Sequence, residues 1–316
     1  MKGNNKMKKI RLLTFHNAHN YGALLQCRAL SAELAKYGEC KLINYIGESI
    51  NYGIISRYAG YKNKLKALLR YFPLKRRYIK MKKYIDSFEQ TSLCDRKTVN
   101  DLQLNDCFCV VGSDQVWACW KKYDPVYFFK DIKAKKKISY AASMGKSEIP
   151  AELQNEIGHC LFDFSNISVR EKSAANLLEK IYGIKPNVVI DPVFLQDKSF
   201  WSKEASFIRT PPRYILTYFL DVPNNAREIV NAVKDRLKIP VLSINSIYNG
   251  KKYGADKDIV DAGPKEFIWL FEHADFVLTS SFHGTAFSLI FEKQFYTIPH
   301  RITSERMVDL LKSIGL

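Results

Sequence analysis

The hydrophobic pattern of this chain switches repeatedly between short apolar runs and longer stretches in which apolar residues recur with a helical period. Such alternation is typical of a mostly parallel β-sheet whose strands are joined by crossover helices. It argues against all-helical and all-β folds. The 316 residues, of which 47% are hydrophobic, are enough for two domains of ordinary size.

The pattern predicts an N-terminal α/β domain over residues 1–200. Its expected strands are 9–15, 41–45, 107–112, 137–142, 166–170 and 187–190, and its expected helices are 21–37, which should stop at Gly38, 151–160 and 172–182. The alternation breaks between Gln196 and Pro212 and then begins afresh.

Residues 201–316 are therefore predicted to form a C-terminal α/β domain. Its expected strands are 214–220, 240–245, 275–279 and 294–298, and its expected helices are 225–237, 264–273, 284–291 and 304–313. The fold class is thus α/β, with two Rossmann-like domains facing a central cleft. Open α/β folds bind ligands at the carboxyl ends of their strands, which is where this cleft would lie.

One basic stretch, residues 49–85, interrupts the first domain as a helical insertion. It holds eleven Lys and Arg residues and no acid, and these account for most of the net charge of +17. Three interpretations stay open: a solvated helical face, a pair of interfacial helices on anionic lipid with Leu65, Leu68, Leu69 and Tyr71 lying shallowly in the membrane, or a nucleic-acid surface. No nucleic-acid module accompanies the stretch, so we favour the membrane and expect no nucleic-acid partner.

Several other classes are disfavoured. No apolar run is long enough to span a membrane and no secretory leader is evident, so we expect a cytoplasmic protein that associates peripherally with the inner face of the plasma membrane. The seven cysteines are odd in number and mostly lie in apolar segments, so no structural disulfide is expected. Nicotinamide and P-loop fingerprints are absent, and no cluster with metal-ligand spacing appears. We expect neither a cofactor nor a metal.

The junction from Ser280 to Thr285 follows an expected strand and opens an expected helix. The first turn of a helix attracts anions through its backbone N–H groups and dipole, and Ser280, Ser281 and Thr285 add hydroxyl groups beside Gly284. His283 would there bind a phosphate or donate a proton to a leaving group. The alternative is a capping histidine without a catalytic role.

A second junction, Gly112 to Trp117, follows another expected strand. Asp114 would accept a proton from a hydroxyl or hold a sugar beside Ser113, and Trp117 would stack on the face of that sugar. The alternative is an N-cap aspartate over a core tryptophan.

Two further junctions complete the candidate site. Arg170 ends an expected strand, and its guanidinium suits a small dianion unless it forms an internal ion pair with Glu171 or a nearby acid. The polar loop that holds Asn20, Tyr21 and Gly22 precedes the first long helix and offers another anion or sugar site. Asp191, before Pro192, is interpreted as a turn.

These blocks together resemble the polysaccharide pyruvyl transferase family. The motifs that carry the resemblance are Asn-Tyr-Gly-Ala-Leu-Leu-Gln from Asn20, Gly-Ser-Asp-Gln-Val-Trp from Gly112, Ser-Tyr-Ala-Ala-Ser-Met-Gly from Ser139, Ile-Ser-Val-Arg-Glu from Ile167, Asp191-Pro192, and Ser-Phe-His-Gly-Thr from Ser281. They span most of the chain, and the second and the last are the most specific.

The resemblance implies a fold like that of glycosyltransferase-B enzymes, with the donor phosphate on the C-terminal domain and the acceptor on the N-terminal domain. It implies transfer of the enolpyruvyl group of phosphoenolpyruvate onto a sugar of a surface or capsular polysaccharide, or onto its lipid-linked precursor, giving a pyruvate ketal. His283, Arg170 and Asp114 would be catalytic. Ligand contacts would come from Asn20, Tyr21, Gly22, Ser113, Trp117, Ser143, Ser280, Ser281, Gly284 and Thr285.

Two departures and two rival functions accompany this resemblance. Some family members carry an arginine where this chain has Ser281, so another group must complete the donor clamp. Relatives are expected to continue beyond Leu316 with a segment able to close over the cleft. The rival enzyme is a glycosyltransferase that uses a nucleotide-sugar donor. The rival without catalysis is a basic membrane- or nucleic-acid-binding protein that uses residues 49–85.

Overall fold

The computed structural model describes residues 7–47, 64–120, 123–146, 148–245, 249–298 and 305–315, with 64–70, 305, 306 and 313 described by backbone alone. These residues form two compact units. The first unit contains the described residues up to 47, residues 85–195 and those from 309 onward, and the second contains residues 64–84 and 196–308.

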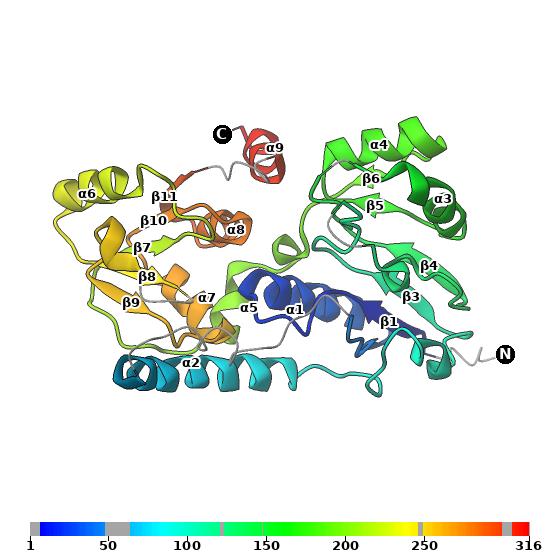
Figure 1. The fold of residues 1–316 in the computed structure, drawn as a ribbon, viewed down its shortest axis with the longest axis horizontal. Coiled ribbons are helices and arrows are strands. Elements are labelled where there is room, and N and C mark those ends of the chain that lie inside the picture. The colour runs from blue at the N-terminus through cyan, green and yellow to red at the C-terminus, as the bar shows by residue number, and fades with distance from the viewer. Residues whose placement is uncertain are drawn as a thin grey trace. The chain divides into compact units, whose positions relative to one another are not determined.

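A parallel sheet organises the first unit (Figure 1). Its order is β2-β1-β3-β4, made of β2 (Glu39–Leu42), β1 (Lys9–Leu13), β3 (Phe108–Val111) and β4 (Lys136–Ser139). Two isolated parallel bridges continue it from β4 toward β5 (Ser168–Val169), which pairs with β6 (Asn187–Val188). The helices of this unit are α1 (Tyr21–Ala35), α3 (Gln154–Phe162) and α4 (Lys172–Tyr182), with short 3-10 helices at Val99–Leu102, Pro125–Phe128, Ala151–Leu153 and Pro192–Leu195.

The second unit is built on a parallel sheet of order β11-β10-β7-β8-β9. Its strands are β7 (Ile215–Tyr218), β8 (Val241–Ile244), β9 (Lys257–Ile259), β10 (Phe276–Thr279) and β11 (Gln294–Thr297). Its helices are α2 (Lys64–Ile85), α5 (Lys198–Glu204), α6 (Ala226–Leu237), α7 (Pro264–Glu272) and α8 (Phe282–Ile290), with a 3-10 turn at Gly250–Tyr253. The helix α9 (Glu305–Ser313) crosses the division between the units.

Each sheet has one point at which the strand order reverses. In the first unit the chain runs from β1 to β2 on one side and then places β3 on the other side of β1. In the second unit it runs from β7 through β8 to β9, and then places β10 on the other side of β7. Loops at the carboxyl ends of the two central strands diverge at such a switch point, which leaves room for a ligand. The sheet topology therefore marks one candidate position in each unit.

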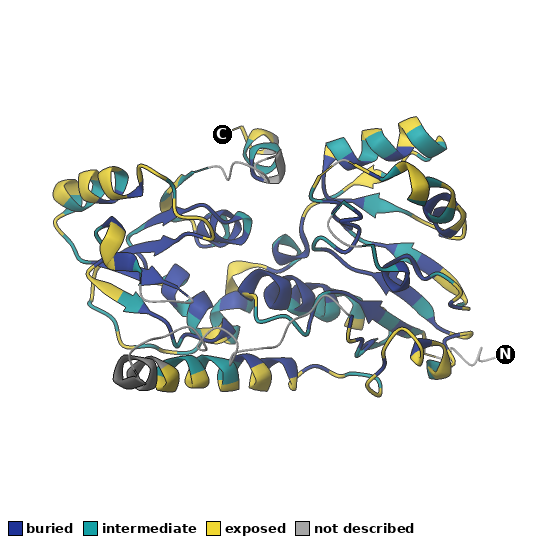
Figure 2. Ribbon diagram, viewed as in Figure 1, coloured by how far each residue is buried: buried dark blue, intermediate teal, exposed yellow. Residues whose placement is uncertain are grey.

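Figure 2 marks the buried positions in both units. The largest fully buried side chains are all aromatic. Trp117 stacks on Phe128 with ring centroids 5.3 Å apart in the first unit. In the second unit, Phe287 packs edge-to-face on Trp201 with centroids 5.0 Å apart. Every residue of β7 and of β8 is buried, as expected for central strands covered on both faces.

The first helix shows how the sequence sets its own boundaries. Asn20 caps the N-terminus of α1, where its side-chain oxygen accepts a hydrogen bond from the amide of Ala23 at 3.3 Å. The helix ends at Ala35, before the predicted stop at Gly38. A Cβ on Gly38 would lie 2.2 Å from the carbonyl oxygen of Lys8, so glycine is needed there for close approach of two segments rather than as a cap.

The predicted α/β class with parallel sheets is confirmed, and every predicted strand has a counterpart. The sequence missed β9, a short edge strand that carries Lys257 and Asp258 and therefore lacks an apolar run. The first part of the basic stretch lies outside the described residues. The sequence predicts that its helical part, α2, belongs to the first domain, but its contacts group it with the second unit. The reason is tertiary: Arg77 donates to the carbonyl of Asn245 at 3.0 Å, and Lys80 pairs with Glu266 at 2.8 Å.

The close approach at Gly38 gives a test of the packing between the starts of β1 and β2. Substitution Gly38→Ala should lower the free energy of unfolding by about 1–3 kcal/mol, because the added methyl group meets a backbone oxygen that cannot rotate away. Urea unfolding measures the change. The control is Gly183→Asn, at a left-handed position with open space, which should change stability little. Equal effects of the two substitutions would contradict the packing described.

Candidate active site

The switch point of the first unit rests on a buried network around Arg170. Its guanidinium donates through one terminal nitrogen to the Asp191 carboxylate and to Ser113 Oγ, the latter at 3.4 Å. Its Nε lies 3.6 Å from a Glu171 oxygen, which also accepts a hydrogen bond from Ser143. The network ties together segments that follow β3, β4, β5 and β6.

Electrostatics favours the charged form of Arg170. Burial alone would lower its pKa, but the negative charges of Asp191, Glu171 and Asp114 outweigh that effect, and the pKa is raised. The side chains of Arg170, Glu171 and Asp191 are at most 4% exposed. The internal ion pair considered for Arg170 is therefore present, with Asp191 as the principal partner. A role in clamping a donor anion stays a prediction.

Two residues near this network have left-handed backbone conformations, the partly exposed Asp114 and the buried Ala141. Asp114 follows β3 with a φ of 76°, and Ala141 follows β4 with a φ of 52°. These left-handed conformations cost non-glycine residues about 1 kcal/mol each, and such strain gathers at functional sites. The backbone of Asp114 is held by the amide of Ser143, which donates to its carbonyl at 3.0 Å. Asp114 is partly exposed, and its carboxylate accepts a hydrogen bond from the amide of Gln115 at 2.8 Å.

The loop after β1 carries further polar side chains. His16 is buried, and its Nδ1 lies 3.0 Å from the Thr14 carbonyl oxygen, so Nδ1 carries the proton and Nε2 accepts from the Asn17 amide at 3.0 Å. Burial lowers the pKa of His16 from 6.5, although the bond to the Thr14 carbonyl opposes this. A neutral His16 thus orients Asn17. Asn20 is exposed, whereas Tyr21 and Gly22 are buried in the first turn of α1.

Trp117 does not meet the prediction that it stacks on a sugar. Its ring is fully buried, and its Nε1 donates to the Tyr127 carbonyl at 3.0 Å. It packs on Phe128 and Phe164 in the core, so no face of the ring is open to a ligand. The alternative is an N-cap aspartate over a core tryptophan. Trp117 is a core residue as that alternative has it, but no helix starts at Asp114.

The switch point of the second unit is framed by hydroxyl groups. Ser280 Oγ accepts from the amide of Leu220 at 3.1 Å and donates to the carbonyl of Asp221 at 2.9 Å, which joins the loops after β10 and β7. Ser281 caps α8 by accepting from the amide of Gly284 at 3.4 Å. Both serines therefore shape the helix start.

The next residues of α8 differ in what they offer a ligand. A Cβ on Gly284 would lie 2.2 Å from Thr279 Oγ1, so this glycine lets the helix pack on β10, and the predicted approach of a ligand is not needed to explain it. Thr285 is fully buried and donates to the Ser281 carbonyl at 3.1 Å. His283 lies in the first turn with 9% of its surface exposed, packed edge-to-face with Phe282 at 5.3 Å. It remains the candidate acid of this unit.

Sequence reasoning missed three members of the site. Asp191 was interpreted as a turn, although it is the main partner of Arg170. Glu171 was considered only as an ion-pair partner, and Tyr140 was not singled out. Burial and the nearby charge of Asp191 raise the pKa of Tyr140 to about 12, so its hydroxyl stays protonated. Position gave a signal for Glu171 and Asp191, which directly follow predicted strands, but not for Tyr140, which lies inside the predicted strand 137–142.

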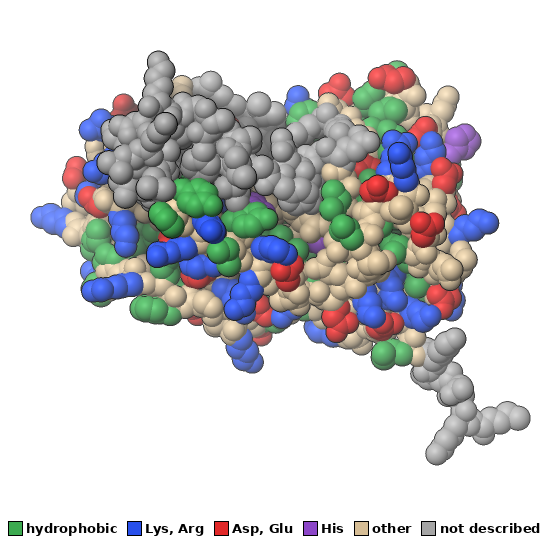
Figure 3. Space-filling model, turned by 60° about the horizontal axis from the view of Figure 1, so that its bottom comes forward, with side chains coloured by type: hydrophobic (Ala, Val, Ile, Leu, Met, Phe, Trp, Pro, Cys, Tyr) green, Lys and Arg blue, Asp and Glu red, His purple; other side chains and the backbone are tan. Residues whose placement is uncertain are grey.

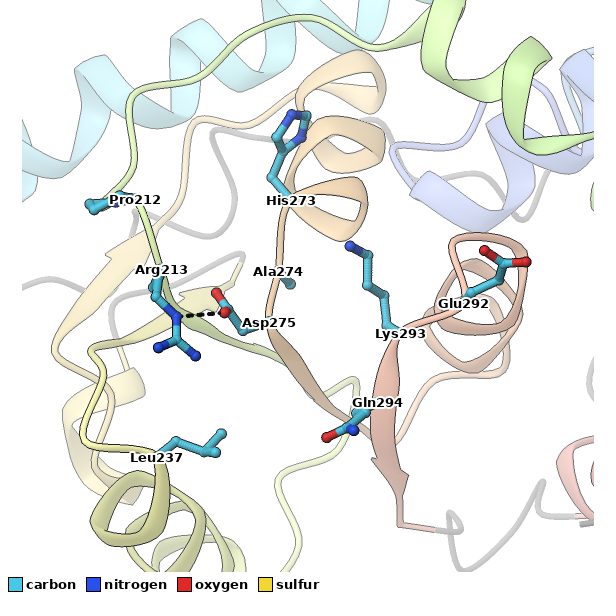
Figure 4. Close-up of a pocket in the computed structure, with 9 residues that line it drawn as sticks. All are labelled: Pro212, Arg213, Leu237, His273, Ala274, Asp275, Glu292, Lys293 and Gln294. Carbon is cyan, nitrogen blue, oxygen red and sulfur yellow. Dashed lines mark hydrogen bonds and ion pairs between the residues drawn. The ribbon is translucent and has the colours of Figure 1, made fainter.

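A separate cavity lies at the other end of the second sheet (Figure 4). It has a volume of about 590 Å³ and is lined by Arg213, Asp275 and Lys293, which lie just before β7, β10 and β11, among other residues. Arg213 is committed to Asp275 at 2.8 Å. Because this cavity lies at the amino ends of the strands, it is distinct from the switch point that holds His283.

Other features bear on the class of protein. All seven cysteines are free thiols, and burial raises the pKa of the Cys109 thiol to about 12. Within the described ranges, no three His, Cys, Asp or Glu side chains gather as metal ligands would, and no helix there combines the length and apolar character needed to cross a bilayer.

The chain is similar to several solved structures at low sequence identity. UDP-GlcNAc 2-epimerase from Neisseria meningitidis, bound to UDP-GlcNAc, matches with a TM-score of 0.50 and 12% identity over 96% of this chain and 85% of that one. The epimerase from Methanocaldococcus jannaschii gives 0.49 and 12% over 98% and 87%. MurG from Acinetobacter baumannii gives 0.44 and 10% over 98% and 84%. No curated protein sequence matches the chain.

Two parallel α/β units, each with polar loops at its switch point, together with the likeness to the Neisseria epimerase, define a protein of the glycosyltransferase-B fold class. The family follows from the sequence motifs that build those loops. A model of the polysaccharide pyruvyl transferase family matches residues 20–301, so the chain belongs to that family and is a transferase.

The buried network predicts a large penalty for removing one carboxylate. Substitution Asp191→Ala should lower the free energy of unfolding by about 3–5 kcal/mol, because it leaves Arg170 with less compensation in a site without solvent. Denaturant unfolding measures this. The matched control is Asp106→Ala, which removes an exposed partner of Lys9 and should have little effect. Similar losses for both variants would show that burial does not govern the network.

The neutral, buried His16 predicts that acid destabilises the protein. Because its pKa is lowered on folding, the unfolded chain binds a proton more readily, and stability falls as the pH drops below about 6.5. His16→Gln should flatten this dependence, measured as the free energy of unfolding between pH 7.5 and a pH of about 5. His159→Gln, at an exposed position, should change stability at pH 7.5 little and is the control for the loss of a histidine. A steep dependence in His16→Gln equal to that of the parent would refute this assignment.

Proposed function

We propose that the protein transfers the enolpyruvyl group of phosphoenolpyruvate to a sugar of a surface polysaccharide or its lipid-linked precursor and closes it into a pyruvate ketal. The observation that carries the proposal is the family match over residues 20–301, because the matched region includes the polar loops at both switch points. The fold likeness alone does not choose this donor.

The reaction has a simple balance. A proton adds to the methylene carbon of the donor, which leaves positive charge on C2, and one sugar hydroxyl adds there. Phosphate then leaves, and a second hydroxyl closes the ketal. One of the two hydroxyl protons restores the acid that protonated the methylene carbon. The other hydroxyl proton leaves with phosphate. The enzyme must therefore supply an acid, accept hydroxyl protons and stabilise the departing phosphate.

The second unit suits the donor. Its switch point combines the start of α8, the hydroxyl-rich loop and His283, and both the helix dipole and an imidazole favour a phosphate. In the proposal, His283 is the general acid or the group that stabilises departing phosphate. Ser281 stands where some family members have arginine, and because its side chain caps the helix, it does not replace that cation.

The first unit suits the acceptor. Asp114 presents a partly exposed carboxylate from a strained loop, and further acids lie beneath it. Carboxylates accept hydrogen bonds from sugar hydroxyls and repel a dianion. In the proposal, Asp114 orients the attacking hydroxyl and accepts its proton. Arg170 then acts mainly by holding Ser113 and Asp191 in place, which supports Asp114 from below.

The reaction is tested directly by incubating the protein with phosphoenolpyruvate and lipid-linked or free sugars that carry neighbouring hydroxyls. We expect phosphate release coupled to a mass gain of one pyruvate less one water on the sugar. Calorimetry should show binding of phosphoenolpyruvate in preference to UDP-GlcNAc. Binding of the nucleotide sugar alone, with transfer of its sugar, would support a glycosyltransferase and overturn the proposal.

His283 gives the sharpest variant. His283→Ala should lower kcat/KM about 10²- to 10³-fold, because it removes a group that acts on charge developing in the transition state. Steady-state phosphate release measures this, and circular dichroism checks folding. His273→Ala, at an exposed histidine of the same unit, should retain parental activity. Full activity in a folded His283→Ala variant would remove the proposed role.

A further inference from the structure

The helix α2 carries no acidic residue but nine Lys and Arg residues, and its two faces are used differently. The inner face is fixed to the second unit. Arg77 donates to the Asn245 carbonyl at 3.0 Å, Lys80 pairs with Glu266 at 2.8 Å, and Met81 and Tyr84 are buried. These contacts fix the orientation of α2 on the second unit. The opposite face of the helix therefore points away from that unit.

We define the outer face of α2 as Phe72, Lys75, Arg76, Ile79 and Lys83, all of which are exposed. Their spacing places them along one side of a helix. Phe72 and Ile79 are 57% and 53% exposed, which is unusual for large apolar side chains on a face so rich in charge. Figure 3 turns this side of the molecule forward and shows Lys and Arg side chains interspersed with hydrophobic ones.

The cations of this face remain available to a partner. In the part of the chain that the structure describes, no acid forms an ion pair with Lys75, Arg76 or Lys83. Lys75 lies 5.7 Å from the centre of the Tyr71 ring, which keeps its charge at the surface. The anchored helix therefore presents uncompensated positive charge together with protruding apolar side chains.

We propose that the outer face of α2 binds the surface of an anionic lipid membrane. Cations attract acidic headgroups, while Phe72 and Ile79 enter the boundary between headgroups and acyl chains, and together these are the requirements for an interfacial helix. A nucleic acid would use the cations but would leave Ile79 exposed to water. The charge and the apolar side chains on one face thus favour lipid. This inference does not depend on the proposed transfer reaction.

Vesicle flotation tests the proposal with the full chain. Vesicles of phosphatidylcholine with about one quarter phosphatidylglycerol should bind the protein, and vesicles of phosphatidylcholine alone should not. The triple variant Lys75→Gln, Arg76→Gln, Lys83→Gln should bind about 100-fold more weakly, since each cation contributes about fivefold. The variant Phe72→Ser, Ile79→Ser should also lose binding, although its charge is unchanged.

A control triple variant removes the same charge elsewhere. Lys251, Lys252 and Lys257 are exposed on the same unit, and their replacement by Gln should preserve vesicle binding. Equal loss in this control would show that net charge alone acts, and no binding of the parent at low salt would reject the site. Tighter binding of an oligonucleotide that displaces the vesicles would overturn the lipid assignment. Phosphate release with a free sugar acceptor should not change in any variant, which separates this test from that of the transferase.

Discussion

A single buried guanidinium joins the loops at the switch point of the first unit. Arg170 contacts Asp191 and Ser113, and Glu171 links it to Ser143, so segments that follow four strands share one charge network. Breaking a buried ion pair strongly destabilises a protein, because it leaves a charge without a partner and without solvent. Movement of one loop away from the others would break such a pair, so the network holds the loops together. This rigidity is what allows Asp114 to keep a left-handed backbone conformation and to present its carboxylate from a fixed position.

The fold was predictable because both sheets are parallel and have covered central strands. Strands such as β7 and β8 are buried on both faces and appear in the sequence as short apolar runs between helical periods. The features that escaped prediction lack that signal. The strand β9 is a charged edge strand, and the attachment of α2 to the second unit depends on Arg77 and Lys80 meeting residues far away in sequence. Local pattern contains no information on such contacts.

The sequence predicts where the loops of the candidate site lie in the fold. It predicts less well which way their side chains point. Parallel topology brings the loops at Gly112–Trp117 and Ser280–Thr285 to the carboxyl ends of strands whatever their side chains do. Whether a side chain faces a ligand or the interior depends on partners elsewhere: Trp117 is held by Tyr127, and Ser280 is held by Leu220 and Asp221. Asp191 shows the opposite case. Its local sequence indicates only a turn, and its role as the ion-pair partner of Arg170 follows from the tertiary structure.

The two switch points differ in charge. This difference indicates which of them suits the acceptor and which suits the donor of the proposed reaction. Near Arg170, the charges of Asp191, Glu171 and Asp114 exceed the one cation that they surround, so a phosphate would be repelled there while hydroxyl groups would be bound as donors. At the start of α8, the dipole, the hydroxyl-rich loop and His283 act in the opposite sense and favour negative charge. A transfer from an anionic donor to a neutral sugar needs both environments, because protons must leave the hydroxyls while negative charge is stabilised on phosphate. In the proposal, the acceptor position and the donor position therefore have opposite electrostatic environments, one in each α/β unit.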